Sequence, residues 1–296
     1  MKKSDRLTFY SYMKNNNSNI LNWQDYKEWV VLFSEFILTK FPNISKEIKE
    51  NKNQIQYVDY SGPLEKYINS HFNDPIFLDE FVCNLKSHYK YILAYHGCRP
   101  TNISSYYQSG LLMLDKKKYN ELFMRIFNKN DFKEISQEHL EEAIQEMNNS
   151  QREDQLYLTI DDRGLLEDAG HYMIYGSEYI MSLTASLSGI LNYDYIPYLR
   201  NIGNPTIFKI KIPLSIIQTS DLQELLPCFF RQWVYNKSRG IVTTHPLDFS
   251  FLLKENILPE NIIEHYHPKE IRDYHQRGQI YIVDKKSYKH DKSSAY

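Results

Sequence analysis

His96 and Gly97 follow directly on a short apolar and aromatic run, residues 91–95 (Tyr-Ile-Leu-Ala-Tyr). Such a run predicts a buried strand, and the His-Gly pair then opens a loop. A histidine ring nitrogen can hydrogen-bond a ligand, and a glycine lets a ligand approach its backbone closely. We therefore expect a ligand site to begin at the end of this strand.

A second unusual stretch covers residues 170–179 (Gly-His-Tyr-Met-Ile-Tyr-Gly-Ser-Glu-Tyr). It predicts a strand up to Tyr175, followed by a helix with Ser177 as its N-cap that runs to residue 189. Tyr172 and Tyr175 offer aromatic rings for stacking. Glu178 falls in the first helical turn, where the helix N-terminus stabilises a carboxylate. Ser177 has no base beside it in sequence and no GxSxG pattern around it, so a cap is a better interpretation than a nucleophile.

These stretches resemble the ADP-ribosyltransferase superfamily. The strand ending in His96-Gly97, with a short helix and a Gly-Leu pair after it, is similar to the family's first NAD-binding element, with Cys98 where the family usually has threonine. The stretch 170–179 is similar to the family's tyrosine-bearing strand and the serine turn behind it. A third match, residues 249–262, ends in Leu-Pro-Glu-Asn-Ile and resembles the closing strand that leads into an Ile-Pro-Pro-x-x-Ile segment.

The resemblance implies that NAD is bound as a substrate, held at both ends so that the bond between nicotinamide and ribose is exposed. His96 would hydrogen-bond the adenosine ribose, and the Gly97 backbone would approach the nicotinamide amide. Tyr172 or Tyr175 would stack on the nicotinamide ring. Ser177, in the turn behind the tyrosines, completes the expected NAD-binding residues.

A carboxylate near the ribose hydroxyls would stabilise the positive charge that develops on the sugar carbon. In the family this is a glutamate at the start of the closing strand, which corresponds here to residues 248–250, and no glutamate stands there. Asp248, one methylene shorter, and Glu178 are the two candidates for the catalytic carboxylate. The missing glutamate favours single transfer over elongation of a poly(ADP-ribose) chain.

We therefore expect a mono-ADP-ribosyltransferase, a glycosyltransferase that uses NAD to modify a protein, RNA or DNA. Enzymes that resemble this family often act as toxins or in antiviral defence against phage, which suggests an antitoxin or regulatory protein as a partner. One alternative is a non-catalytic interaction module that retains the fold. Another is an enzyme resembling RNA 2′-phosphotransferase, which needs several basic residues around a phosphate, and only Arg99 can be placed there.

The elements around these residues predict an α+β protein, by resemblance a split β-sheet domain with a helical N-terminal region. Residues 1–90 form that helical region, residues 91–283 the α+β domain and residues 284–296 a polar tail. Helical patterns cover 20–41, 64–72, 76–89, 103–110, 116–147 and 222–235, the last interrupted near Pro227, and strand patterns cover 155–160, 206–212, 241–244 and 249–253.

Composition excludes several classes of protein. The 296 residues are 42% hydrophobic with a net charge of −2, which suits a packed core and argues against coating nucleic acid by bulk charge, although a local basic groove is compatible. Three cysteines without a CxxC pair, no secretory leader and no long apolar run predict a cytoplasmic protein without a membrane partner. HExxH, GxGxxG and P-loop motifs are absent, so we expect no metal site and an unusual mode of binding NAD.

Overall fold

The computed structural model describes residues 19–55, 57, 72–128, 132–147 and 154–283. The chain divides into two compact units: unit 1 takes in residues 1–93 and 212–245, and unit 2 takes in residues 94–211 and 246–296. The expected helical region thus gains a second segment from later in the sequence. The helix expected over residues 64–72, apart from its last residue, and the polar tail 284–296 lie outside the described residues.

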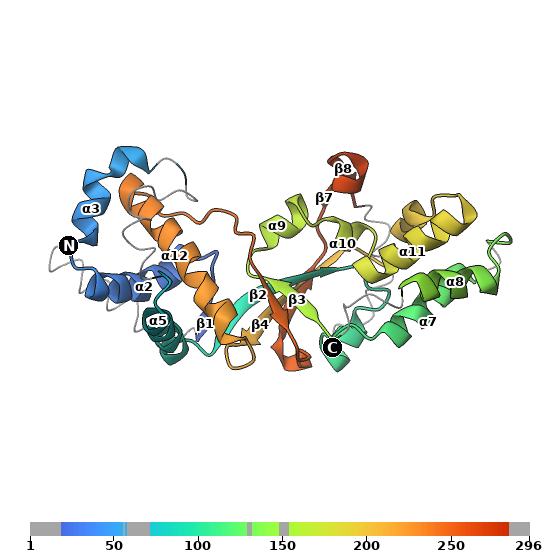
Figure 1. Ribbon diagram of the computed structural model, residues 1–296, viewed down its shortest axis with the longest axis horizontal. Helices are drawn as coiled ribbons and strands as arrows, with labels where there is room; N and C mark the ends of the chain where they lie inside the picture. Colours follow the sequence, from blue (N-terminus) through green and yellow to red (C-terminus); the bar gives the residue numbers. More distant parts are fainter. Residues whose placement is uncertain (1–18, 56, 58–71, 129–131, 148–153, 284–296) are drawn as a thin grey trace. The chain divides into compact units, whose positions relative to one another are not determined.

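Unit 1 has an aromatic core between its helices, and Figure 1 shows α12 beside α2, α3 and α5. The ring of Phe229, in the middle of α12, lies 4.5 Å from that of Trp29 and 5.2 Å from that of Trp23, both edge to face. Such pairs add to the burial of apolar area. The elements are β1 (Ile20–Leu21), α2 (Tyr26–Lys40), α3 (Ile44–Glu50), the 3-10 turn η1 (Lys52–Gln54), α5 (Pro75–His88) and α12 (Thr219–Arg239).

The start of α5 confirms the expected helix from residue 76 to 89. Asp74 accepts a hydrogen bond from the backbone N–H of Ile76, and Pro75 occupies the first turn, where it loses no helical hydrogen bond. The interruption expected near Pro227 is wrong, because α12 runs continuously through this proline. Apolar side chains before and after Pro227 are fully buried and offset the missing hydrogen bond.

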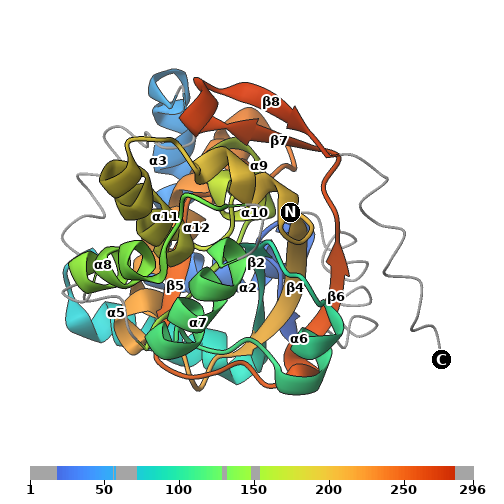
Figure 2. The same ribbon diagram turned by 90° about the vertical axis from the view of Figure 1, so that its right-hand side faces the viewer.

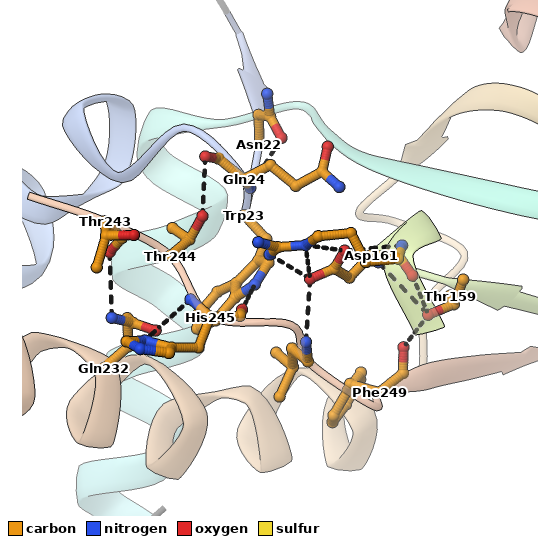
Figure 3. Close-up of polar contacts among 12 residues, drawn as sticks. Asn22, Trp23, Gln24, Thr159, Asp161, Gln232, Thr243, Thr244, His245 and Phe249 are labelled. Atoms are coloured by element: carbon orange, nitrogen blue, oxygen red, sulfur yellow. Dashed lines mark hydrogen bonds and ion pairs between the residues drawn. The ribbon is translucent and has the colours of Figure 1, made fainter. Parts of the chain in front are cut away.

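Two further expectations for unit 1 are wrong. Residues 20–21 form the short strand β1, parallel to residues 91–92, and the helix begins only after Asp25, whose side chain accepts from Lys27 N. Residues 241–244 form no strand. Side chains of α12 hydrogen-bond to this backbone instead. Gln232 Nε2 donates to the Thr243 carbonyl O at 3.1 Å (Figure 3). Asn236 Nδ2 donates to the same oxygen at 2.7 Å.

Unit 2 is built on a sheet with the strand order β5-β3-β2-β4-β6, which places the His-Gly strand β2 in the middle. β3 pairs antiparallel with β2 and β5, and β4 pairs antiparallel with β6, with Tyr95 opposite Thr159 and Leu158 opposite Phe251. Mixed helices and antiparallel strands make the protein α+β, as expected. The strands are β2 (Tyr91–Cys98), β3 (Leu156–Thr159), β4 (Thr206–Pro213), β5 (Ser250–Leu253) and β6 (Ile262–Tyr266), with a separate hairpin of β7 (Glu270–Asp273) and β8 (Gln279–Ile282).

The helices of unit 2 are mostly where the sequence predicts them, and Figure 2 shows α7 and α8 beside α11. The expected long helix over 116–147 is divided into α7 and α8. None of the helices among the described residues has the length and apolar character that a membrane span needs. The helical elements are α6 (Ser104–Ser109), α7 (Lys116–Phe127), α8 (Gln137–Met147), α9 (Asp162–Glu167), α10 (His171–Ile174), α11 (Glu178–Leu191) and the 3-10 turns η2 (Ile196–Asn201), η3 (Pro259–Asn261) and η4 (Tyr274–Gln276).

The strand expected up to Tyr175 is wrong, because residues 171–174 form the helical turn α10. Gly170 lies against the backbone of β7, and a methyl group on it would lie 2.4 Å from the carbonyl O of Arg272. That contact turns the chain at Gly170, and the helical turn then buries Met173 and Ile174 completely. An apolar run of this length does not distinguish a strand from a helix by its pattern.

Replacing Gly170 by alanine should lower the free energy of unfolding by about 1–3 kcal/mol, because the added methyl group meets backbone that cannot move aside. Urea unfolding measures this. Gly189→Ala is the matched control, because the space around residue 189 of α11 is open. In a helix the control should be neutral or stabilising by about 0.5–1 kcal/mol. Equal stability of the two variants would contradict the close contact at Gly170.

Candidate functional site

His96 lies on the central strand β2 with one ring nitrogen occupied. Its Nδ1 lies 3.0 Å from the backbone O of Tyr157 on β3. A carbonyl only accepts, so the proton of the neutral ring is assigned to Nδ1, and Nε2 becomes an acceptor. Burial lowers the pKa of His96 and keeps the ring neutral at pH 7. His96 is thus prepared to accept a hydrogen bond from a ligand hydroxyl at Nε2.

Gly97 lies against two elements that follow β3 in the chain. A methyl group on Gly97 would lie 3.4 Å from Met173 Cγ of α10 and 3.5 Å from Leu165 Cδ1 of α9. Arg99 holds α10 in this place, since its Nη1 donates to the Met173 carbonyl O at 2.9 Å. The end of β2 and the tyrosine-bearing turn, which are far apart in sequence, are therefore in contact. A ligand over Gly97 would displace the flexible Met173 side chain.

Two side chains of the second stretch, Tyr172 and His171, meet at the carboxylate of Glu178. The Tyr172 hydroxyl donates to Glu178 Oε1 at 2.9 Å, and His171 Nε2 lies 3.8 Å from the same oxygen. Glu178 opens α11 directly after Ser177, whose hydroxyl accepts from Ile180 N at 3.3 Å as the predicted N-cap. The Glu178 side chain is 37% exposed, so a ligand can reach its carboxylate. Sequence reasoning missed His171, which its position beside Tyr172 could have indicated.

Tyr175 lies elsewhere, in a buried polar group. Its side chain is only 2% exposed, and its hydroxyl donates to Asp273 Oδ2 at 2.7 Å. Arg200 Nη2 donates to the Tyr175 hydroxyl at 2.5 Å and to Asp273 at 2.8 Å, and burial raises the pKa of Tyr175 to about 12. This group joins α10, η2 and β7. Stacking on a ligand therefore belongs to Tyr172, which is not fully buried.

Asp248 is exposed, on a segment whose backbone is fixed on both sides. The Leu247 N–H donates to Asp161 Oδ2 at 3.0 Å, and Thr159 Oγ1 donates to the Phe249 carbonyl O at 3.0 Å. Strand β5 begins immediately afterwards, at Ser250. Asp248 thus lies two residues before the start of β5. The structure gives no contact between its carboxylate and the group around Glu178.

Asp161 is a second residue whose role the sequence did not show, since the stretch 161–164 reads as a turn. It is fully buried, caps α9 through Arg163 N, and pairs with the Arg163 guanidinium at 2.5 Å. A carboxylate without exposure to water is stable as a charge only with such partners. Its bond to Leu247 N makes it the link between α9 and the segment of Asp248.

The histidines that could suggest a metal are engaged in other contacts. His265 Nδ1 lies 2.7 Å from the Tyr107 hydroxyl, and His267 Nδ1 lies 2.7 Å from the Pro205 carbonyl O. Within the described parts of the chain, no three histidine, cysteine or acidic side chains are grouped to hold a metal ion. Of the candidate site residues, the structure brings Gly97 against α10 and Tyr172 onto Glu178, while His96, Ser177 and Asp248 have separate contacts of their own.

The half-buried histidines His96 and His171 should make the stability of the protein depend on pH. Burial lowers the pKa of both His96 and His171, and His275 adds to the shift of His171 while Asp273 opposes it. The unfolded chain, with a histidine pKa of about 6.5, then binds more protons than the folded chain below that pH. Stability should be full above pH about 6.5 and fall as the pH drops towards about 5.

The measurement is urea unfolding at a series of pH values for the wild type and for His171→Gln. The stability of the variant should fall less steeply below pH about 6.5 than that of the wild type, since the variant has one histidine fewer to protonate. An identical dependence on pH in both proteins would show that His171 does not contribute.

Comparison with known proteins assigns the chain to no family. No protein-family model matches the chain, and no similar protein was found among curated proteins or solved structures.

Proposed function

We propose that unit 2 is a mono-ADP-ribosyltransferase that uses NAD as a substrate and transfers ADP-ribose to a protein or nucleic acid. The observation that supports this best is the contact of Gly97 with α10, whose Tyr172 holds the Glu178 carboxylate. The histidine-glycine strand end and an exposed carboxylate at a helix start therefore belong to one set of contacts. The resemblance to the ADP-ribosyltransferase superfamily singles out the histidine-glycine pair and a tyrosine, and Glu178 is one of the two candidates for the carboxylate that the superfamily has at the start of its closing strand.

The residues have distinct roles in this proposal. Neutral His96 accepts a hydrogen bond at Nε2 from a ribose hydroxyl and so fixes the adenosine end of NAD. Tyr172 offers a ring face to the nicotinamide, next to Gly97. Glu178 accepts from the hydroxyls of the second ribose and stabilises the positive charge that develops as the bond to nicotinamide breaks. Nicotinamide leaves with the bonding electron pair, and a nucleophile of the acceptor takes its place on the sugar carbon.

The expected strength of this charge interaction sets how large a loss of rate the removal of the carboxylate should cause. A carboxylate about 5 Å from the developing charge contributes about 3 kcal/mol at an effective dielectric constant near 20. That energy corresponds to a rate change of about 100-fold. A loss of this order on removing the negative charge is therefore expected for the catalytic carboxylate, and a much smaller one for a surface residue.

Glu178→Gln should lower kcat for nicotinamide release from NAD by about 100-fold while KM changes little, because only the transition state carries the charge. Asp248→Asn is measured in parallel as the second candidate. Glu255→Gln is the matched control, an exposed carboxylate in the loop after β5, and should keep full activity. A loss in Asp248→Asn with full activity in Glu178→Gln would transfer the role to Asp248.

His96→Ala should raise KM for NAD, since the variant loses the bond to the adenosine ribose. Urea unfolding checks that the variant is folded. Full turnover at unchanged KM would remove His96 from the site.

The acceptor is found by incubating the protein with labelled NAD and a cell lysate, and separating protein, RNA and DNA. Label in one fraction names the acceptor class. No label and no released nicotinamide would favour a non-catalytic module that retains the fold. A toxin or antiviral defence role in the cytoplasm, under an antitoxin or regulatory protein, belongs to the proposal through the family resemblance alone.

Arg99, the one basic residue that could be placed for the phosphotransferase alternative, has a structural role instead. The Arg99 guanidinium donates to the backbone carbonyls of Met173, Arg200 and Ile202, so it serves to hold α10 and η2.

A further inference from the structure

Unit 1 contains a pocket of about 360 Å³ whose wall is strongly basic. It lies between α3, the turn η1 and the end of α12, which are neighbours in Figure 1. The volume is within the range of small-molecule sites, about 300–1,000 Å³. Four cationic side chains line it, together with two serines, an isoleucine and a glycine: Lys49, Lys52, Lys237, Arg239, Ser45, Ser238, Ile48 and Gly240.

The lysines of this pocket have no acidic partners in the part of the chain that the structure describes. No ion pair there joins Lys49, Lys52 or Lys237 to a carboxylate, whereas the neighbouring Lys46 is paired with Glu50 at 3.7 Å. The Lys237 ammonium lies 5.3 Å from the centre of the Trp233 ring, and partial burial lowers its pKa. Desolvation of a cation without a carboxylate is a cost that a bound anion would offset.

Among the described residues, Arg239 makes a hydrogen bond to the backbone of the pocket wall, unlike the three lysines. Its Nη2 donates to the Ile55 carbonyl O at 3.0 Å, which ties the chain after η1 to the last turn of α12. The Gly240 N–H closes that turn on the Asn236 carbonyl O at 2.8 Å. The wall is therefore made of elements that are fixed to one another.

Helix capping does not account for this charge. The C-termini of α3 and α12 both lie at the pocket, and each carries about half a negative charge. Together they offset about one of the three positive charges of Lys49, Lys52 and Lys237, so about two are left. A chain with a net charge of −2 concentrates this excess in one pocket. An anion with more than one negative charge is the ligand that fits such a surplus.

We propose that this pocket binds phosphate groups, carried by a small phosphorylated ligand or by successive phosphodiesters of a nucleic acid strand. Lysine ammonium groups act as point charges on phosphate oxygens, and the serine hydroxyls provide further donors. The site lies wholly in unit 1 and does not depend on the function proposed for unit 2.

The test measures binding of three probes to the full chain by calorimetry: inorganic phosphate, ADP and a single-stranded 12-residue oligothymidine. The pocket variant carries Lys49→Gln with Lys237→Gln. The matched control carries Lys86→Gln with Lys90→Gln, two exposed lysines of unit 1 outside the pocket. The pocket variant should bind at least one probe about 10- to 30-fold more weakly, and the control should bind as the wild type does.

The probes distinguish the sources of phosphate. Weaker binding of ADP or phosphate by the pocket variant supports a small phosphorylated ligand. Weaker binding of the oligothymidine by the pocket variant supports nucleic acid. The magnitude of the slope of log K against log salt should then fall by about 1.4, which is about 0.7 for each lysine removed. Equal affinity of wild type and pocket variant for every probe, or no binding at all, overturns the proposal. So does ADP binding that is lost in His96→Ala and retained in the pocket variant.

Discussion

The buried carboxylate of Asp161 is the constraint on which the surroundings of the candidate site depend. It is 0% exposed, and its bonds to Arg163 and to Leu247 N connect α9 with the segment that leads into β5. Removing one partner of a buried charge pair costs about 3–5 kcal/mol, and less here because the Arg163 side chain is 34% exposed. Without this carboxylate, α9 with Leu165 would lose its N-cap, and the segment of Asp248 would keep the bond from Thr159 to the Phe249 carbonyl but lose the one at Leu247 N.

Other buried polar groups complete the support of α10. Arg99 binds it from β2, and the Tyr175 hydroxyl binds it to Asp273 of β7 through a group that Arg200 shares. A four-residue helix has too few internal hydrogen bonds to be stable alone, so these partners must hold it. The polar residues whose side chains could take part in chemistry thus fall into two groups. Tyr175, Arg99 and Asp161 hold the structure, while Tyr172, Glu178 and Asp248 are the residues to which we assign roles toward a ligand.

Much of the fold could be predicted where the signal is local. The helical pattern of residues 76–89 predicted α5, the strand pattern of residues 206–212 predicted β4, and Ser177 predicted the start of α11. The predictions for residues 170–175 and 241–244 were wrong because tertiary partners occupy the backbone there. β7 approaches Gly170, and α12 side chains take the Thr243 carbonyl that a strand would have paired.

The sequence by itself determined the elements and the residue types at their ends: a strand ending in His96-Gly97, and a helix that begins with Ser177 and Glu178. Caps, proline positions and periodicity act through backbone within a few residues, so they can be read from the chain. Only the tertiary structure decided that Tyr172 meets Glu178 while Tyr175 is buried on Asp273, 98 positions away. It alone also gathered the basic pocket from α3 and α12. Such contacts depend on which distant segments share the core, and no local pattern encodes that.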